Sequence, residues 1–244
     1  MKTPLLAMKT PFLIVLALAG LTGLTACLGS APPVPRDHYY RIMVTPPKGA
    51  IASQTASIED APVLGWGILG QPGSSAAILD FPGVLVVAQL EAEGLLRERP
   101  LLYSATGSAT EMQQHDYHYW MDPPTRMLQL ELVDYLRASG LARSVVTPEM
   151  RIKADFEVNG RIKRLERLLG GGPTRVVVEL ELSMVARADN ELIVVGSYIA
   201  EANAADDGIE SSVLAFNEVL GQVFERFLAD ATWSHTAFLA APMN

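Results

Sequence analysis

Cysteine is almost absent from this chain, since Cys27 is the single one among 244 residues and no disulfide can form within it. The folded part must therefore be stable through packing and hydrogen bonding alone. Only four histidines are present, and no serine lies in the Gly-x-Ser-x-Gly pattern of a nucleophile elbow. We therefore expect a protein that is not an enzyme and that holds no metal or cofactor.

Basic residues are also few relative to acidic ones. The chain has 19 Lys and Arg against 27 Asp and Glu, which gives a formal net charge of −8. An acidic surface repels phosphate backbones, so nucleic acid is not an expected partner. It also disfavours flat adsorption on anionic lipid, so any attachment to a membrane should be covalent.

Charge is missing altogether from residues 10–35, behind a basic start. The apolar part of this stretch, residues 12–24, is short and interrupted by glycines, which is typical of a signal peptide rather than a membrane-spanning helix. Residues 24–27, Leu-Thr-Ala-Cys, resemble a lipobox. The sequence predicts a signal peptide over residues 1–26 and a lipid anchor on Cys27. The alternative is an uncleaved membrane anchor with an incidental cysteine.

The residues after the cysteine suggest where the anchor lies. Residue 28 is Leu, whereas the usual enterobacterial signal for retention in the inner membrane is Asp. We therefore expect a lipid-anchored protein of the outer membrane that faces the periplasm. Residues 27–37 contain three prolines and predict a semi-rigid tether of about 3 Å per residue. A near repeat of the first residues at 8–13 leaves Met8 open as a second start.

The rest of the chain is predicted to form one α+β domain. This domain covers residues 38–232 and includes a loose insertion at residues 48–82. A C-terminal tail follows at residues 233–244. Alternating apolar and polar residues over 156–202 predict an antiparallel meander with one solvated face. Short apolar and aromatic runs predict further strands at residues 38–44, 84–90, 100–103 and 117–120, and the insertion could hold another near residues 63–69.

Two amphipathic helices are expected to cover this sheet. Asp122 is placed to cap a helix that starts at Pro123 and ends before Gly140. The second helix has an apolar stripe that should pack on the meander, although a lipid-binding or partner-binding surface is the alternative. The predicted fold class is therefore α+β, an antiparallel-rich β-sheet with two amphipathic helices packed on one face. The stripe consists of Ile209, Val213, Phe216, Leu220, Val223 and Phe227.

Few residues suggest chemistry. His115 and His118 could form a metal pair, but residues three apart in a regular strand face opposite sides, and no third ligand is near. Three glutamates, Glu91, Glu93 and Glu98, lie among arginines and predict a salt-bridged surface rather than a catalytic pair. Aromatic side chains with polar tips are favoured at interfaces, and about half should alternate into the core. The candidate partner contacts are Tyr39, Tyr40, Tyr103, Tyr119 and Trp120.

Taken in order, these features resemble the ABC-type transport auxiliary lipoproteins, the family of paraquat-inducible protein C. The resemblance covers most of the chain after Cys27. Its motifs are the lipobox, Tyr-Tyr-Arg at residues 39–41, Pro-x-x-Tyr at residues 100–103, Trp followed by Pro within residues 120–123, the meander and the terminal amphipathic helix.

The resemblance implies a part in lipid transport between membranes. Such systems pair an inner-membrane ABC transporter with mammalian-cell-entry-type proteins that bridge the periplasm. This chain would be the docking and accessory subunit, anchored in the membrane through acylated Cys27, with phospholipid binding and homo-oligomerisation left open. One alternative is a carrier that encloses the lipid between sheet and helices, which needs a cavity of about 300 Å³ or more. Another is a lipoprotein hydrolase, which needs a cleft with converging titratable groups.

Overall fold

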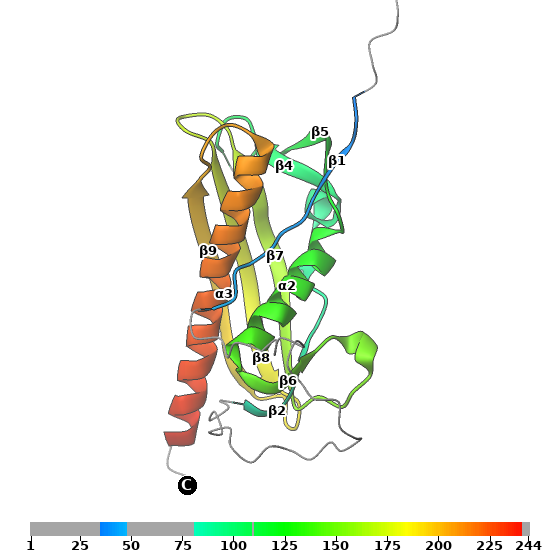
Figure 1. The fold of residues 1–244 in the computed structure, drawn as a ribbon. Helices are drawn as coiled ribbons and strands as arrows, with labels where there is room; N and C mark the ends of the chain where they lie inside the picture. The colour runs from blue at the N-terminus through cyan, green and yellow to red at the C-terminus, as the bar shows by residue number, and fades with distance from the viewer. Residues whose placement is uncertain (1–34, 48–80, 109, 241–244) are drawn as a thin grey trace, which may run out of the picture. The chain divides into compact units, whose positions relative to one another are not determined.

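A mixed sheet with two helices on one face makes up the fold (Figure 1). The computed structural model describes residues 35–47, 81–108 and 110–240, with side chains as far as residue 234. The leader, Cys27, most of the tether and nearly all of the insertion, including its predicted strand, lie outside the described residues. The chain divides into two units between Arg36 and Asp37, and the sheet and both helices belong to the second unit.

Nine strands form this sheet within the described residues, and each short strand predicted there is present with shifted ends. The strands are β1 (His38–Tyr40), β2 (Phe81–Val87), β3 (Glu91–Ala92), β4 (Pro100–Ser104), β5 (Gln113–Trp120), β6 (Ala142–Val146), β7 (Phe156–Leu168), β8 (Arg175–Ala186) and β9 (Leu192–Asn203). The helices are α2 (Pro124–Ser139) and α3 (Ile209–Ala240), and two short 3₁₀ turns are η2 (Gly94–Arg97) and η3 (Pro148–Met150).

β7 is the centre of the sheet because both of its edges are paired. β8 runs antiparallel along one edge for the whole length of the strand. Along the other edge β2, β3 and β4 follow one another, all parallel to β7. β9 continues antiparallel from β8, so the predicted antiparallel meander is confirmed.

The wider prediction of an antiparallel-rich sheet is wrong. Five of the eight strand pairings among the described residues are parallel. Residues 81–104 form one path that runs beside β7 in the same direction, with the η2 turn between β3 and β4. Periodicity marks where strands lie, whereas pairing direction depends on connections such as α2, which let the chain return in parallel.

Local signals define the ends of α2 only in part. Gly140 ends the helix as predicted, with a φ of +70° that glycine adopts without steric cost. The predicted cap by Asp122 is wrong, because Pro123 occupies the capping position and no side chain bonds there. The Pro123 carbonyl oxygen instead accepts bonds from Arg126 and Met127 N–H at 2.9 and 3.0 Å. The inner face of the helix is buried and includes Leu128, Leu132, Tyr135 and Leu136.

α3 covers β8 and β9 with the apolar stripe predicted from the sequence. Five of the six stripe residues are buried and Ile209 is partly buried, so packing on the meander is confirmed. Trp120 on β5 meets Phe216 edge to face, with ring centroids 5.5 Å apart. The helix continues to Ala240, so the tail predicted from residue 233 is helical that far. Within the described residues, no helix has the length and apolar character needed to cross a membrane.

The strand predicted over residues 38–44 ends at Tyr40. The next residues form a strap (residues 41–47) that passes between α2 and α3 (Figure 1). Side chains from both helices, rather than a neighbouring strand, accept hydrogen bonds from its backbone. Ile42 is 0% exposed and anchors the strap in the core.

β7 also carries a buried ion pair. Glu166 is 1% exposed, and its Oε1 accepts hydrogen bonds from Arg164 Nε and Nη2 at 2.7 and 2.6 Å. The other carboxylate oxygen has no hydrogen-bond partner in the part of the chain that the structure describes. Arg164 is therefore the group that balances this buried charge.

Replacing Arg164 with Met should lower the free energy of unfolding by about 3 kcal/mol, because Glu166 would remain buried without a counter-charge. Urea unfolding of the chain from Asp37 onward measures this loss. The matched control is Arg175→Met, which breaks an exposed pair with Glu201 and should cost less than about 1 kcal/mol. Equal losses in the two variants would contradict the interpretation.

Candidate functional site

Parallel pairing of β1 with β5 builds the predicted aromatic cluster. The register places Tyr39 beside Tyr119, with ring centroids 5.7 Å apart. It places His38 beside His118, with stacked rings 5.0 Å apart. Because side chains alternate along a strand, the cluster has two sides, here called the outer patch and the inner network.

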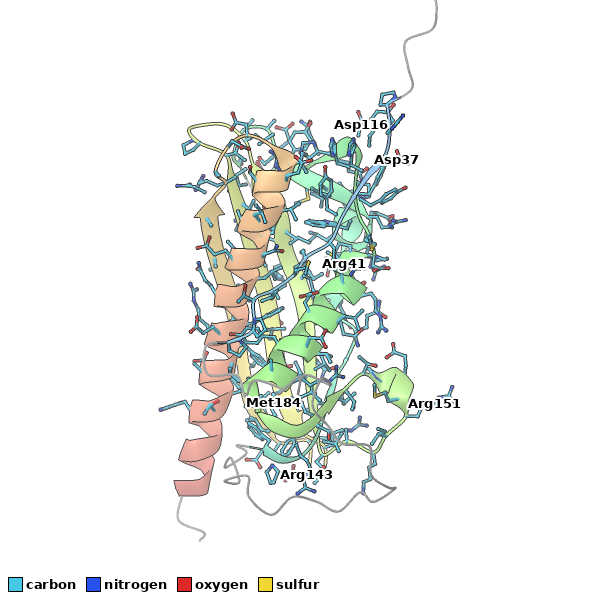
Figure 2. The ribbon with its side chains drawn as sticks, viewed as in Figure 1. Asp37, Arg41, Asp116, Arg143, Arg151 and Met184 are labelled. Carbon is cyan, nitrogen blue, oxygen red and sulfur yellow. The ribbon has the colours of Figure 1, made fainter. Side chains whose placement is uncertain are left out.

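The outer patch consists of Tyr39, Tyr119 and Arg99. The Arg99 guanidinium lies 5.2 Å from the centroid of the Tyr39 ring, a cation–π contact. Tyr39 is 51% exposed, and its hydroxyl donates to Asp37 Oδ2 at 3.2 Å. Asp37 is labelled in Figure 2, at the end of the sheet where β1 and β5 pair. A depression of about 220 Å³ lies beside these side chains, so the patch stays a predicted partner contact.

The other three candidate contacts lie on the inner side. Trp120 is 1% exposed, so its prediction as a partner contact is wrong: alternation along β5 points its ring into the core. Tyr40 and Tyr103 are partly buried in the inner network. The Tyr103 ring lies 4.3 Å from the His115 ring, and its hydroxyl donates to Gln113 Oε1 at 2.6 Å.

Tyr117 distorts β5 and brings two histidines to the same side. Its φ is +62°, a left-handed conformation that is uncommon for residues other than glycine. The rings of His115 and His118 consequently lie 6.1 Å apart, so the argument that separated them by strand alternation is wrong. Among the described residues, no three side chains of His, Cys, Asp or Glu are grouped so that they could hold a metal.

Arg167, near the end of β7, is the centre of the inner network and is 2% exposed. Its Nε donates to Ser212 Oγ and its Nη2 to the carbonyl oxygen of Asp207, both at 2.8 Å. Its Nη1 lies 2.8 Å from His115 Nε2. Because arginine only donates, this histidine nitrogen must accept, which requires a neutral ring with its proton on Nδ1. These bonds attach the start of α3 to the sheet.

The surroundings of the network shift the pKa values of three of its side chains, His115, His118 and Tyr40. Burial, together with the charge of Arg167, lowers the pKa of His115 to about 4. Burial lowers the pKa of His118 as well. Burial and the nearby Glu210 raise the pKa of Tyr40 to about 12. The Tyr40 phenol oxygen lies 2.9 Å from His118 Nδ1 and 3.3 Å from Glu210 Oε1, and so links β1, β5 and α3.

The glutamates that precede β4 form surface contacts. Glu91 and Glu93 both pair with Arg161 of β7, at 3.1 and 3.7 Å. The predicted salt-bridged surface is confirmed for these two, although their partner is a distant residue rather than the adjacent arginines. Arg97 instead donates to the carbonyl oxygen of Ala92 at 2.6 Å.

A cavity of about 820 Å³ lies where β7 begins and β8 turns into β9, at the opposite end of β7 from Arg167. Its lining mixes charged side chains, such as Lys153 and Arg187, with apolar ones, such as Leu192 and Ile193. The space between the sheet and the helices is instead filled by one core cluster. Fully buried side chains in that cluster include Phe81, Leu85, Leu101, Leu128, Leu132, Phe216 and Phe224.

A groove of about 530 Å³ lies between the strap and α3. Sequence reasoning missed this groove because it forms only when two distant segments meet. The sequence did contain one indication of the groove, namely that Leu214 is apolar although it lies outside the predicted stripe of α3. In the structure this side chain is 69% exposed.

The lowered pKa of His115 predicts a dependence of stability on pH. The unfolded chain takes up a proton at this residue near pH 6.5, whereas the folded chain does so near pH 4. Stability should therefore fall as the pH falls through this window. His115→Gln removes the titrating group but keeps an acceptor for Arg167. Its unfolding free energy should decline less steeply than that of the wild type, by up to about 1.4 kcal/mol per pH unit.

His115→Phe is the matched control for this experiment. It removes both the titration and the acceptor, so it should flatten the pH profile and also lower stability at pH 7. Urea unfolding of the three proteins at several pH values between 7 and 4 separates the two effects. A profile for His115→Gln as steep as that of the wild type would contradict the assignment.

Comparisons with solved structures agree with this fold. A crystal structure of a protein from Xanthomonas campestris is 16% identical, has a TM-score of 0.59, and the match covers 67% of this chain and 91% of that one. A crystal structure of an uncharacterized protein is 14% identical with a TM-score of 0.55, and covers 80% of this chain and 99% of that one. At these identities the likeness concerns the fold alone. No protein of curated function matches the chain by sequence.

The match to a family model is what identifies the chain. Residues 69–227, more than half of the sequence, match the model of the ABC-type transport auxiliary lipoprotein component. This region runs from the insertion to the end of the α3 stripe and contains eight of the nine described strands. The chain therefore belongs to the family of ABC-type transport auxiliary lipoproteins.

Proposed function

We propose that this chain is the docking and accessory subunit of an ABC-type system that moves lipid between membranes. It is held at the outer membrane, facing the periplasm, through acyl chains on Cys27. Its partners are a mammalian-cell-entry-type protein and the inner-membrane subunits of the transporter. ATP hydrolysis takes place in the transporter, and this chain is not itself an enzyme.

The main support for a docking role, rather than a carrier role, is the filled core. The space between sheet and helices is filled by buried side chains, so the chain offers surfaces rather than a chamber. The inner network supports this interpretation, because its hydrogen bonds hold α3 and β5 in place. The outer patch is the exposed part of the same cluster, with Tyr39 and Arg99 available to a partner.

The anchor is supported by the lipobox at residues 24–27 and by the position of the outer patch in the chain. Asp37 and Tyr39 come ten and twelve residues after Cys27. Even fully extended, ten residues span at most about 35 Å. A partner at the membrane surface is therefore within reach of the patch.

A carrier that encloses lipid is the second candidate, and the cavity of about 820 Å³ is the observation in its favour. This cavity is large enough for a drug-sized ligand. Its lining is rich in charge, however, and comes mostly from the end of the sheet, with Ser234 of α3 as the one helical residue among those described. Lipid extraction after purification tests the carrier. Stoichiometric phospholipid supports it, and its absence supports a subunit that only docks.

Replacing Cys27 with Ala should abolish membrane attachment, because no acyl chains can then be added. We expect the variant to move from the membrane pellet to the soluble fraction. Its thermal unfolding midpoint should equal that of the chain from Asp37 onward, because the fold does not depend on the anchor. Fractionation followed by immunoblotting measures this change. A variant that still pellets with membranes would show that another feature is the anchor.

The residue after the cysteine tests the choice of membrane. Leu28→Asp introduces the enterobacterial retention signal, so in an enterobacterial host we expect the lipoprotein to shift from the outer to the inner membrane on a sucrose gradient. Leu28→Ala is the matched control and should stay in the outer membrane. If the wild-type protein is already found in the inner membrane, the proposed location is wrong.

Affinity purification from detergent-solubilised envelopes tests the docking role directly. The lipidated wild-type chain should recover the mammalian-cell-entry-type protein and the transporter subunits, identified by mass spectrometry. Recovery of none of them by a protein that is lipidated and folded would overturn the proposed function.

A further inference from the structure

The groove beside the strap exposes two large apolar side chains. Met43 from the strap is 68% exposed and Leu214 from α3 is 69% exposed. Both line the same groove of about 530 Å³, together with Pro46, Pro47 and Tyr135. Apolar side chains that gather in an exposed groove are typical of a binding surface.

Hydrogen bonds hold the strap side of the groove in place. Met43 N–H donates to Asn217 Oδ1 at 3.0 Å, and Val44 N–H donates to Glu131 Oε2 at 2.9 Å. Ile42, which precedes these two residues in the chain, has a fully buried side chain. A groove that is already ordered loses little conformational entropy when a partner binds.

The charged side chains among the described residues that line the groove are both negative. They are Glu218 and Glu225 of α3, and no Lys, Arg or His lines the groove within this described part. Neither glutamate forms an ion pair with any residue in the described part of the chain. A partner with basic side chains would form ion pairs with both glutamates and would therefore bind in preference to an acidic partner.

We propose that the groove docks a basic, amphipathic segment of the periplasmic partner. Apolar side chains of that segment cover Met43 and Leu214, and its Lys or Arg side chains pair with Glu218 and Glu225. This inference rests on the proposed function, since it names the surface at which the docking subunit meets the transport system.

Charge argues against the other occupants. An anionic lipid surface would be repelled by Glu218 and Glu225. A second copy of the chain carries a net charge of −8 and would bring charge of the same sign. A basic protein segment satisfies both the apolar and the acidic parts of the groove.

The test uses the full-length lipidated chain and affinity purification from detergent-solubilised envelopes. Leu214→Glu and the double variant E218K/E225K should each reduce recovery of the partner by about tenfold or more, as expected for side chains central to an interface. Val195→Glu is the matched control for the first variant, because Val195 is 57% exposed on β9. The double variant E181K/E191K makes the same change of charge at exposed residues away from the groove.

The outcomes separate this inference from the proposed function. If the wild-type chain recovers no transport subunit, both fail. If the wild-type and groove variants recover the partner equally, the groove inference is overturned and the proposed function stands. Thermal unfolding and membrane fractionation of each variant establish that it is folded and anchored.

A photo-crosslinking residue at position 214 identifies the occupant. The inference requires crosslinks to a partner segment with net positive charge and apolar residues, mapped by mass spectrometry. Crosslinks that lead to an acidic segment, to phospholipid, or to this chain in the same or a second copy would overturn it.

Discussion

The rest of the sheet depends on the pairing of both edges of β7. Buried backbone N–H and C=O groups must be hydrogen-bonded, and β7 satisfies them with β8 on one edge and with β2, β3 and β4 on the other. This arrangement places β4, β5 and β1 at the end of β7 that carries Arg167. The outer patch and the inner network therefore lie at one end of β7, and the charged cavity lies at the other.

Arg167 links α3 to the sheet through hydrogen bonds from its buried guanidinium. The buried guanidinium of Arg167 forms no ion pair in the described part of the chain, so neutral acceptors must satisfy it. Ser212 in the first turn of α3 and the carbonyl oxygen of Asp207, just before the helix, supply two of them. Moving the helix would leave these donors unpaired, at about 1–3 kcal/mol each. The position of Leu214 in the lining of the groove is thereby fixed as well.

The sequence predicted what local periodicity and turn chemistry determine. The meander, the stripe of α3 and the end of α2 at Gly140 all follow from spacing within one segment. Pairing direction could not be predicted, because β2 and β7 are far apart in the chain and either direction satisfies the same pattern. The side-by-side histidines were missed because the positive φ of Tyr117 has no signal in a non-glycine residue. The capping role of Asp122 failed because Pro123 already supplied the carbonyl that α2 needs.

The filled core leaves two candidate surfaces for a partner, and their charged side chains differ. The outer patch combines Arg99 over Tyr39 with Asp37 and Glu98, whereas the charged side chains of the groove are Glu218 and Glu225. Both adjoin residues 37–47, which begin ten residues after Cys27. Because so short a segment separates Cys27 from both surfaces, the lipid anchor proposed there would hold a partner of either surface near the membrane. The resulting effective concentration would strengthen binding without any further contact, so moderate affinity at each surface would be sufficient for the proposed docking subunit.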